Sequence, residues 1–345
     1  MTFEYQRVPE FAGGRRLHLN ENTRGCSPAV LAAIRGLDAT RLAFYPAYAS
    51  AIRRCADHLG VDRDAIVLTN GLDEGIMAAC LVAARDRRIE PESIVIEPAF
   101  DMYAACTDAA GGTVVTVAPE ADFVFPTAAV LAAITPVTRL VFLTNPNNPT
   151  GRIIESETIA HIAHAAPQAT IFLDEAYGDF ARTSFLPVRH AHPNVLIGRT
   201  FAKAHGLAAL RVGVVIGAPD RLEALRRAIT PYSLNVCAAV ALEAALDDPG
   251  HVAAYVAEVE QSRRLLYAAC DRWRVDYWES AANFVLIRLG DRTAEVVSAL
   301  ARRGIFVRDR SNEPGCAGCV RITAGVVDDT RACIQAMEEI LCDAR

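Results

Sequence analysis

Lys203 stands alone in a chain that otherwise relies on arginine for its basic side chains. It is the only lysine among 35 lysine and arginine residues. A guanidinium stays charged, whereas a desolvated lysine amine can lose its proton and condense with a carbonyl to form a Schiff base. Glycines flank the lysine, and Arg211 follows eight residues later. This pattern favours carbonyl chemistry at Lys203, and a chance surface lysine in an arginine-rich protein is the alternative.

Four polar clusters follow short apolar runs that are typical of strands. They span residues 70–74, 145–151, 174–177 and 200–203. Ligands of open α/β sheets bind outside the carboxyl ends of the strands, so we expect these clusters to share one pocket. A single cluster would be consistent with an ordinary turn, whereas four at one edge indicate a site.

The clusters suit a phosphorylated aldehyde cofactor. Backbone N–H groups at Gly71, Leu72 and Asp73, at the start of a predicted helix, can hold a phosphate. Arg211 can add a bidentate contact and Thr200 a hydroxyl. Asp174 ends an apolar run and would be costly to bury unpaired, so it predicts a cationic partner such as a protonated pyridine nitrogen.

The elements that must position these residues alternate between strands and alanine-rich helices. This alternation favours an α/β layered domain with a mostly parallel sheet. We expect strands at 65–69, 93–96, 113–117, 139–143, 170–173, 194–198 and 211–216. We expect helices at 29–37, 49–59, 73–85, 101–109, 126–134 and 155–166, and an ordered loop at 41–48.

After residue 235 the pattern changes to longer helices at 236–246 and 251–271. Strands at 283–288, 305–307 and 320–323, with helices at 293–303 and 328–342, are typical of a small α+β domain. We therefore predict a large domain at 40–245 and a small domain built from 1–39 and 246–345.

Composition limits the classes of protein that need to be considered. The 345 residues are 52% hydrophobic and 22% charged, as in ordinary globular proteins. A net charge of −6 gives no general attraction to nucleic acid or to anionic membranes. The chain has no apparent signal peptide or spanning segment, which favours a cytoplasmic location. The ten cysteines are expected to be reduced, with Cys316 and Cys319 as incidental thiols, and no metal site is expected.

These motifs together resemble the fold type I, class I/II pyridoxal-phosphate aminotransferases, and most closely the histidinol-phosphate aminotransferases. The resemblance runs from about Leu17 to the C-terminus. It rests on Asn70-Gly-Leu-Asp-Glu74, Asn145-Pro-Asn-Asn-Pro-Thr-Gly151, Asp174-Glu-Ala-Tyr177 and Arg199-Thr-Phe-Ala-Lys-Ala-His-Gly-Leu-Ala-Ala-Leu-Arg211, with further agreement at 45–46, 98–103, 231–235, 308–309 and 319–325. It implies a three-layer α/β/α large domain and a small α+β domain.

The resemblance also implies a role for each matching residue. Lys203 would form the Schiff base with pyridoxal 5'-phosphate, Asp174 would pair with the pyridinium nitrogen, and Asn148 and Tyr177 would bind the phenolic oxygen. Tyr103 would stack on the ring, with a core position as the alternative. The phosphate would be held by Gly71, Leu72, Asp73, Thr200 and Arg211, and by Tyr45 from a second subunit of a homodimer with shared active sites. Arg321, Asn148 and Arg24 would bind the substrates, a small amine and a 2-oxo acid such as 2-oxoglutarate.

Three positions depart from the family pattern and leave the substrate open. Ala202 and Ala209 stand where serine and glycine are usual, and Arg24 stands where an aromatic residue is often found. The functions that remain are a histidinol-phosphate aminotransferase, an aminotransferase for another or more specialised biosynthetic amine, and a phosphothreonine-type decarboxylase. A pyridoxal-phosphate binding or regulatory protein is disfavoured, because a carrier does not need the complete residue set.

Overall fold

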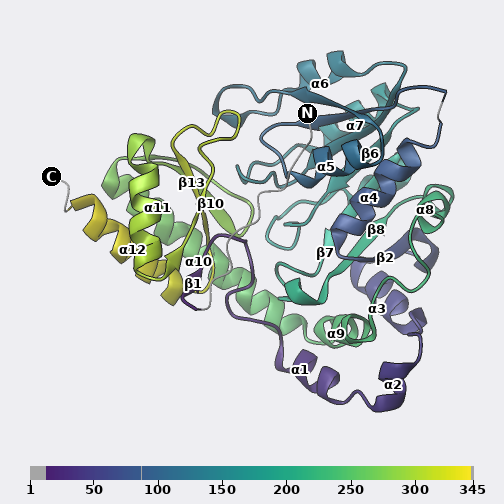
Figure 1. The fold of residues 1–345 in the computed structure, drawn as a ribbon, viewed down its shortest axis with the longest axis horizontal. Coiled ribbons are helices and arrows are strands. Elements are labelled where there is room, and N and C mark those ends of the chain that lie inside the picture. The colour runs from purple at the N-terminus through teal and green to yellow at the C-terminus, as the bar shows by residue number, and fades with distance from the viewer. Residues whose placement is uncertain (1–12, 87, 343–345) are drawn as a thin grey trace.

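A seven-stranded sheet forms the centre of the larger part of the protein, and helices cover both of its faces (Figure 1). The computed structural model describes residues 13–86 and 88–342. In spatial order the strands are β2 (Ile66–Asn70), β8 (Val212–Ile216), β7 (Val195–Thr200), β6 (Thr170–Asp174), β5 (Thr138–Thr144), β3 (Glu92–Ile96) and β4 (Thr113–Val117). This order confirms the predicted layered α/β architecture.

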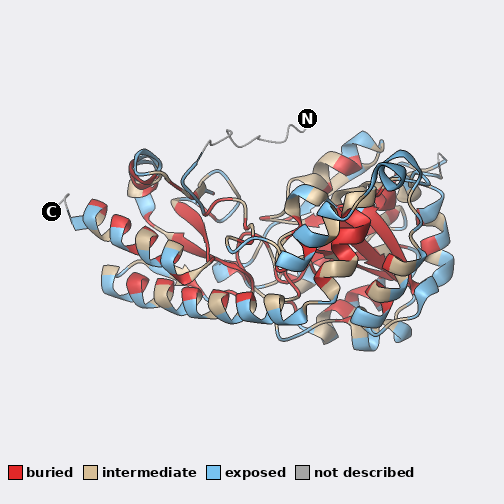
Figure 2. Ribbon diagram, turned by 90° about the horizontal axis from the view of Figure 1, so that it is seen from below, coloured by how far each residue is buried: buried red, intermediate tan, exposed pale blue. Residues whose placement is uncertain are grey.

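Side chains alternate along each strand between two hydrophobic cores, one on each face of the sheet. In β6, Ile171 and Leu173 enter one core and Phe172 enters the other. The first core is shared with α1 (Pro28–Arg35), α3 (Ala49–Leu59), α6 (Thr127–Ala133), α7 (Ser156–Ala165) and α9 (Val236–Leu246). The second is shared with α4 (Leu72–Ala83), α5 (Met102–Ala109) and α8 (Pro219–Arg226). Figure 2 shows this buried sheet between helices whose outer faces are exposed.

Strand β8 is antiparallel to both of its neighbours, and the other six strands run parallel to one another. A parallel return requires a crossover of a dozen or more residues, usually through a helix. The connection from β7 to β8 contains only the short 3₁₀ turn Ala208–Leu210, so β8 returns in the opposite direction. Lys203 lies in this connection.

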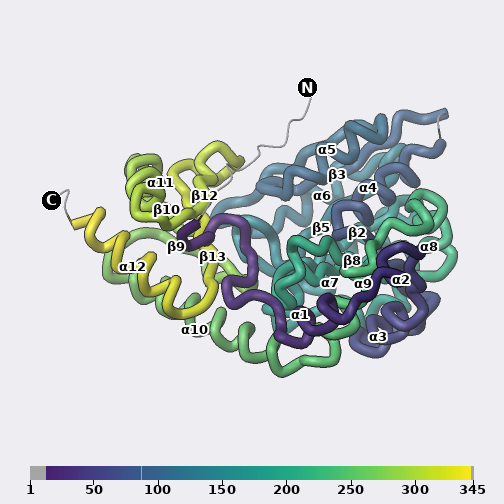
Figure 3. Tube along the Cα trace, turned by 60° about the horizontal axis from the view of Figure 1, so that its bottom comes forward, coloured from purple at the N-terminus to yellow at the C-terminus, as the bar shows by residue number. Residues whose placement is uncertain are grey.

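The smaller part of the protein pairs a four-stranded antiparallel sheet with three helices. The sheet order is β12 (Arg308–Asp309), β13 (Cys319–Thr323), β10 (Phe284–Arg288) and β9 (Asp276–Trp278), and β1 (Arg15–Arg16) pairs in parallel with β11 (Ile305–Phe306). The helices are α10 (Pro249–Trp273), α11 (Thr293–Arg302) and α12 (Val327–Cys342). The 25-residue α10 runs from the region of α9 to this sheet (Figure 3). No described helix is long and apolar enough to cross a membrane.

Some elements differ from the expectations drawn from the sequence. Residues 39–43 form helix α2 (Ala39–Ala43), which overlaps the loop expected at 41–48. The Asp38 carboxylate caps this helix by accepting from Arg41 N at 2.7 Å. Strands β1, β9 and β12 and helix α8 were not predicted. The three strands have at most three residues each, too few for a hydrophobic period to appear. Helix α8 has a proline in its first turn, a start signal that the prediction overlooked.

The N-terminal segment contributes to both parts of the protein. Leu17 is buried in the core of the small sheet, whereas Val30 of α1 is buried in the core that α9 shares with the large sheet. The boundary at residue 39 therefore stays a prediction. The packing shows that Leu17 and α1 belong to different cores.

Candidate active site

A cavity of about 520 Å³ lies where the small sheet faces the carboxyl ends of β5, β6 and β7. Most of the predicted site residues line it: Leu72, Asp73, Tyr103, Asn148, Asp174, Tyr177, Thr200, Lys203, Arg211 and Arg321. They come from segments more than 200 residues apart in the chain. The structure therefore brings the predicted clusters together in one place, while the roles of the individual residues remain proposals.

Lys203 reaches the cavity from a tight turn that follows β7. The turn is closed by backbone hydrogen bonds from Leu207 N to Phe201 O at 3.0 Å and from Gly206 N to Lys203 O at 3.2 Å. Lys203 Nζ donates to Leu19 O at 3.1 Å and lies 5.9 Å from the centre of the Tyr177 ring. No carboxylate of the described residues lies within 4.0 Å of Nζ, so the amine is held by a neutral acceptor.

Asp174 ends β6 with its carboxylate buried in the wall of the cavity. One carboxylate oxygen accepts from Tyr103 OH at 2.6 Å, and the other accepts from Ala176 N at 2.8 Å. Burial raises the pKa of the Asp174 carboxyl to about 6, although these hydrogen bonds oppose the shift. A cation in the cavity would reverse this effect, since it would favour the charged carboxylate.

Tyr103 has the contacts of a core aromatic residue in this structure. Its ring stacks on Phe142 with centroids 4.6 Å apart, and its hydroxyl lies 2.9 Å from Thr144 Oγ1 in addition to its bond to Asp174. Only 1% of the residue is exposed. Stacking on a cofactor ring thus stays a prediction, and the contact that is present is one that fixes the Asp174 carboxylate.

Gly71, at the start of helix α4, meets Arg211 at the mouth of the cavity. Gly71 has φ +74° and ψ 165°, and a Cβ built there would lie 2.5 Å from Arg211 Nη2. Arg211 Nη2 forms an ion pair with Asp73 Oδ2 at 2.8 Å, and about half of each side chain is exposed. The open first turn of α4 and a free face of the guanidinium form a cradle that suits an anion.

Arg321 is buried on β13 with only neutral hydrogen-bond partners. Its guanidinium donates to Asn148 Oδ1 at 2.5 Å and to His18 O at 2.6 Å, and it lies 5.4 Å from the centre of the Phe284 ring. Burial, with the repulsion of Arg310, lowers the pKa of Arg321 to about 10. The side chain is still a cation at neutral pH, and no carboxylate of the described residues lies within 4.0 Å of its nitrogens.

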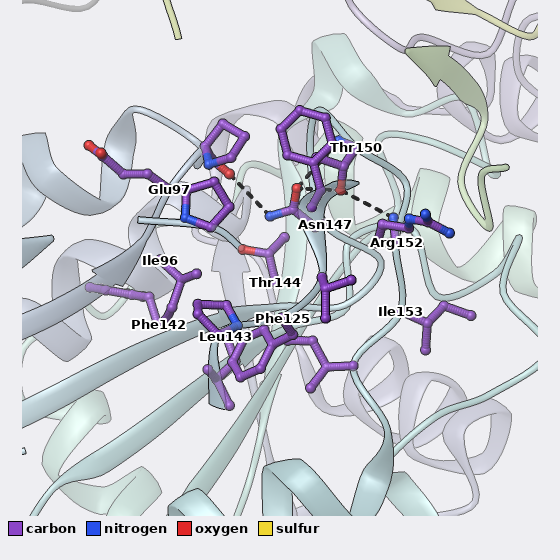
Figure 4. Close-up of a pocket in the computed structure, with 16 residues that line it drawn as sticks. Ile96, Glu97, Phe125, Phe142, Leu143, Thr144, Asn147, Thr150, Arg152 and Ile153 are labelled. Atoms are coloured by element: carbon purple, nitrogen blue, oxygen red, sulfur yellow. Dashed lines mark hydrogen bonds between the residues drawn. The ribbon is translucent and has the colours of Figure 1, made fainter. Parts of the chain in front are cut away.

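The partner of Arg321, Asn148, is held by the turn that follows β5. Figure 4 shows a neighbouring pocket of about 40 Å³ in which the Asn147 side chain ties this turn together. Asn147 Nδ2 donates to Pro98 O at 3.2 Å, and Asn147 Oδ1 accepts from Thr150 Oγ1 at 2.8 Å. Asn147 thus supports the residue that faces the cavity.

Gly71 adjoins the cavity through Arg211 without lining it, and two other predicted residues lie farther from it. Tyr45 is 79% exposed and stacks on Tyr232 with ring centres 4.3 Å apart. Arg24 pairs with Glu258 Oε2 at 3.0 Å and lines an adjoining hollow beside Ala202 and Gly206. A role for Tyr45 requires a second subunit, and a substrate contact by Arg24 stays a prediction.

The comparison with known proteins defines the family. Residues 15–336 match the family model for aminotransferase class I and II. The chain belongs to this family. It is 34% identical over 334 residues to a histidinol-phosphate aminotransferase of Geobacillus sp. (strain WCH70), which covers 94% of this chain and 90% of the relative.

Two solved structures agree with this assignment. A putative histidinol-phosphate aminotransferase from Erwinia carotovora atroseptica superposes with a TM-score of 0.87 at 26% identity, over 96% of this chain and 97% of that chain. The histidinol-phosphate aminotransferase from Sinorhizobium meliloti in complex with pyridoxal-5'-phosphate gives 0.84 at 27% identity, over 96% and 92%. This aminotransferase is accordingly a pyridoxal-phosphate-dependent enzyme.

The cavity of the aminotransferase fits that cofactor. The cradle of Gly71 and Arg211 suits its phosphate, and the buried Asp174 carboxylate lacks a cationic partner within 4.0 Å among the described residues. A pyridinium nitrogen would supply that partner. Lys203 lines the same cavity, where its amine can meet an aldehyde.

Three arginines that sequence reasoning left without a role also line the cavity: Arg16, Arg308 and Arg310. Arg310 is only 7% exposed and pairs with Glu313 Oε1 at 2.5 Å, while Arg16 forms a bidentate pair with Glu21. Arg308 lies directly opposite Arg321 in the β12–β13 ladder. Arg308 and Arg310 are two residues apart in the sequence, and this spacing could have indicated that both side chains face the same side. Only the fold shows that they face this cavity.

Proposed function

We propose that this aminotransferase transfers the amino group of histidinol phosphate to 2-oxoglutarate. The observation that carries the proposal is the cross-strand pair of Arg308 and Arg321 in the wall of the cavity. Like charges directly opposite in an antiparallel ladder are destabilising, and no described carboxylate within 4.0 Å compensates either one. A bound anion between the two guanidinium groups would remove the repulsion.

The charges of the two substrates suit this pair. Histidinol phosphate carries a phosphate dianion and no carboxylate, and 2-oxoglutarate carries two carboxylates. Arginine forks bind both groups with two parallel hydrogen bonds. One pocket can thus serve both half-reactions, and the histidinol-phosphate aminotransferases among the relatives support the choice of amine.

The remaining residues are assigned roles in the transfer itself. The cofactor supplies an electron sink for the charge left when the substrate loses its Cα proton. We assign removal of that proton to the Lys203 amine, which lies 5.9 Å from the Tyr177 ring within the same cavity. Asp174 and Asn148, which line the same cavity, would hold the cofactor ring, and Arg211 with the first turn of α4 would hold its phosphate.

The active enzyme is proposed to be a homodimer. Large apolar side chains are exposed close together in the chain at Leu42, Phe44 and Tyr45, and Tyr45 stacks on the exposed Tyr232. A contiguous apolar surface of this kind is typical of an interface. Docking a second copy there would cover it and would bring Tyr45 towards the partner's cavity.

A comparison of four amines tests the substrate. The enzyme loaded with pyridoxal phosphate is mixed in turn with histidinol phosphate, glutamate, phenylalanine and phosphothreonine, and the absorbance of the bound cofactor is followed. We expect the fastest changes with histidinol phosphate and glutamate. Release of carbon dioxide from phosphothreonine would support the decarboxylase alternative, and a fast change with another amine alone would support a different biosynthetic aminotransferase.

A further inference from the structure

A polar network, centred on the buried ion pair of Glu175 and Arg199, lies directly behind the residues that line the cavity. We call it the Glu175 network, and it comprises Glu175, Asp179, Ser184, Arg199 and His205. The Glu175 side chain is 1% exposed and that of Arg199 is 12% exposed, and their carboxylate and guanidinium are 2.9 Å apart. Ser184 Oγ and Phe185 N donate to the Glu175 carboxylate at 2.8 Å each. The pair is therefore desolvated, and both oxygens of the Glu175 carboxylate accept hydrogen bonds.

The network continues from Arg199 along the turn that carries Lys203. Arg199 Nη1 lies 3.6 Å from Asp179 Oδ1, and the other oxygen of Asp179 lies 3.7 Å from His205 Nδ1. His205 is 3% exposed, and its ring meets the edge of the Phe201 ring at a centroid distance of 5.0 Å. The Arg199 guanidinium also lies flat on Gly178, where a Cβ would come within 2.4 Å of Nη1.

The members of the network alternate in sequence with the proposed site residues. Asp174 and Gly198 are paired in the β6–β7 ladder. Glu175 and Arg199 are the next residues along the two chains, so their side chains point to the face opposite that of Asp174. On the first segment, which follows β6, Glu175 and Asp179 flank Tyr177. On the second segment, the end of β7 and the turn after it, Arg199 precedes Thr200, and His205 follows Lys203 by two residues. The network joins the two segments on the side away from the cavity.

We propose that the Glu175–Arg199 pair, extended through Asp179 to His205, is a positioning network that sets the spacing between Asp174, Tyr177 and Lys203. The inference rests on the roles given to these three residues in the proposed function. The planar fork of Arg199, on the segment after β7, reaches both Glu175 and Asp179 on the segment after β6, which a single-point cation does not do. Because a misplacement of about 1 Å can lower a rate by about 100-fold, this spacing affects catalysis without contact with substrate.

The first test replaces Glu175 by glutamine. Glu175→Gln keeps the shape of the side chain and leaves Arg199 paired only with Asp179. We expect the rate constant of the amine half-reaction to fall about 10- to 100-fold while KM changes by less than about threefold. The pH midpoint of the visible absorbance of the bound cofactor should shift by about half a unit or more, because it reports the surroundings of the Lys203 nitrogen.

A second variant separates positioning from stability. In Glu175→Leu/Arg199→Met both charges are replaced by apolar side chains, a change that folded proteins often tolerate. We expect this protein to fold and to bind the cofactor, with thermal unfolding of the cofactor-free form close to that of the wild type, and to show the same loss of rate and shifted midpoint. The matched control is Glu223→Gln, which breaks the exposed Glu223–Arg227 pair and should change none of these values.

Two results would overturn the proposal. One is a Glu175→Gln or double variant that folds with the rate constant and absorbance midpoint of the wild type. The other is failure of both variants to fold, which would assign the network to stability. All rate constants are measured with the amine that reacts fastest with the wild type. The comparison of variants with the wild type therefore does not depend on the proposed substrate. A wild-type protein without cofactor absorbance would instead contradict the site assignment.

Discussion

Asp174 ends β6 in a position where water cannot stabilise its charge. Burial raises its pKa to about 6 from 3.8. Because the folded pKa lies above the unfolded value, the cofactor-free protein binds this proton more tightly when folded. Its stability therefore falls as the pH rises from about 4 to about 6, and the full penalty, up to about 3 kcal/mol, remains above that range.

Asp174→Asn should separate stability from activity. At pH 8 the cofactor-free variant is expected to unfold at a higher temperature than the wild type, and the difference should shrink as the pH falls through 6. The variant should still bind pyridoxal phosphate through its phosphate, yet lose activity by about 100-fold or more, because an amide does not stabilise a pyridinium by charge. A variant that fails to fold would give Asp174 a structural role instead.

The positive charge of Arg308 can be tested as part of a subsite for an anionic substrate group. Arg308→Gln removes the repulsion with Arg321 across the ladder, so the cofactor-free protein should keep its stability or gain up to about 1 kcal/mol. KM for histidinol phosphate should rise at least about tenfold, whereas KM for phenylalanine should change much less. Steady-state kinetics with both amines measure the contrast, and Arg264→Gln on the exposed side of α10 is the control. An equal rise for both amines would contradict an anion subsite.

The junction between β2 and α4 depends on one glycine. Gly71 has a backbone conformation that is essentially restricted to glycine, and its missing Cβ leaves room for Arg211. We expect Gly71→Ala to destabilise the protein by about 1–3 kcal/mol and to weaken cofactor binding at least about tenfold, measured by titration of the cofactor-free enzyme. Gly60→Ala is the control, since Gly60 also has positive φ but has no atom near the added Cβ. It should lose stability only, and equal cofactor affinity in both variants would contradict the cradle.

The sequence predicted the elements with strong periodicity and the site residues that follow strands. The strands that end near Asn70, Asp174 and Thr200 appear within two residues of their expected ends. The reversal of β8 and helix α2 were not predicted, because they depend on the length of a connection and on one capping side chain. Arg16, Arg308 and Arg310 escaped assignment for a further reason. Arg16 and Arg308 lie on two-residue strands and Arg310 directly follows one, and whether such a side chain faces a cavity is decided by how the two cores meet.

A single chain exposes large apolar side chains that a second copy would cover. Leu42, Phe44 and Tyr45 are 60%, 70% and 79% exposed. We expect a dimer in analytical ultracentrifugation and expect Phe44→Glu to give a monomer with little activity, because burying an unpaired charge at an interface is unfavourable. Val188→Glu, at another exposed apolar position, should remain a dimer. An active Phe44→Glu monomer would contradict shared active sites.

We propose above all that Lys203 binds the carbonyl of the cofactor in the cavity between the two parts of the chain. Borohydride reduction of the yellow loaded enzyme, followed by proteolysis and mass spectrometry, measures this directly, because Lys203 is the only lysine side chain available. We expect one modified peptide, containing Lys203 with the reduced cofactor attached. We also expect Lys203→Arg to lose both the modification and the transamination. Attachment at the α-amino group instead, or a Lys203→Arg protein with near-normal turnover, would contradict this proposal.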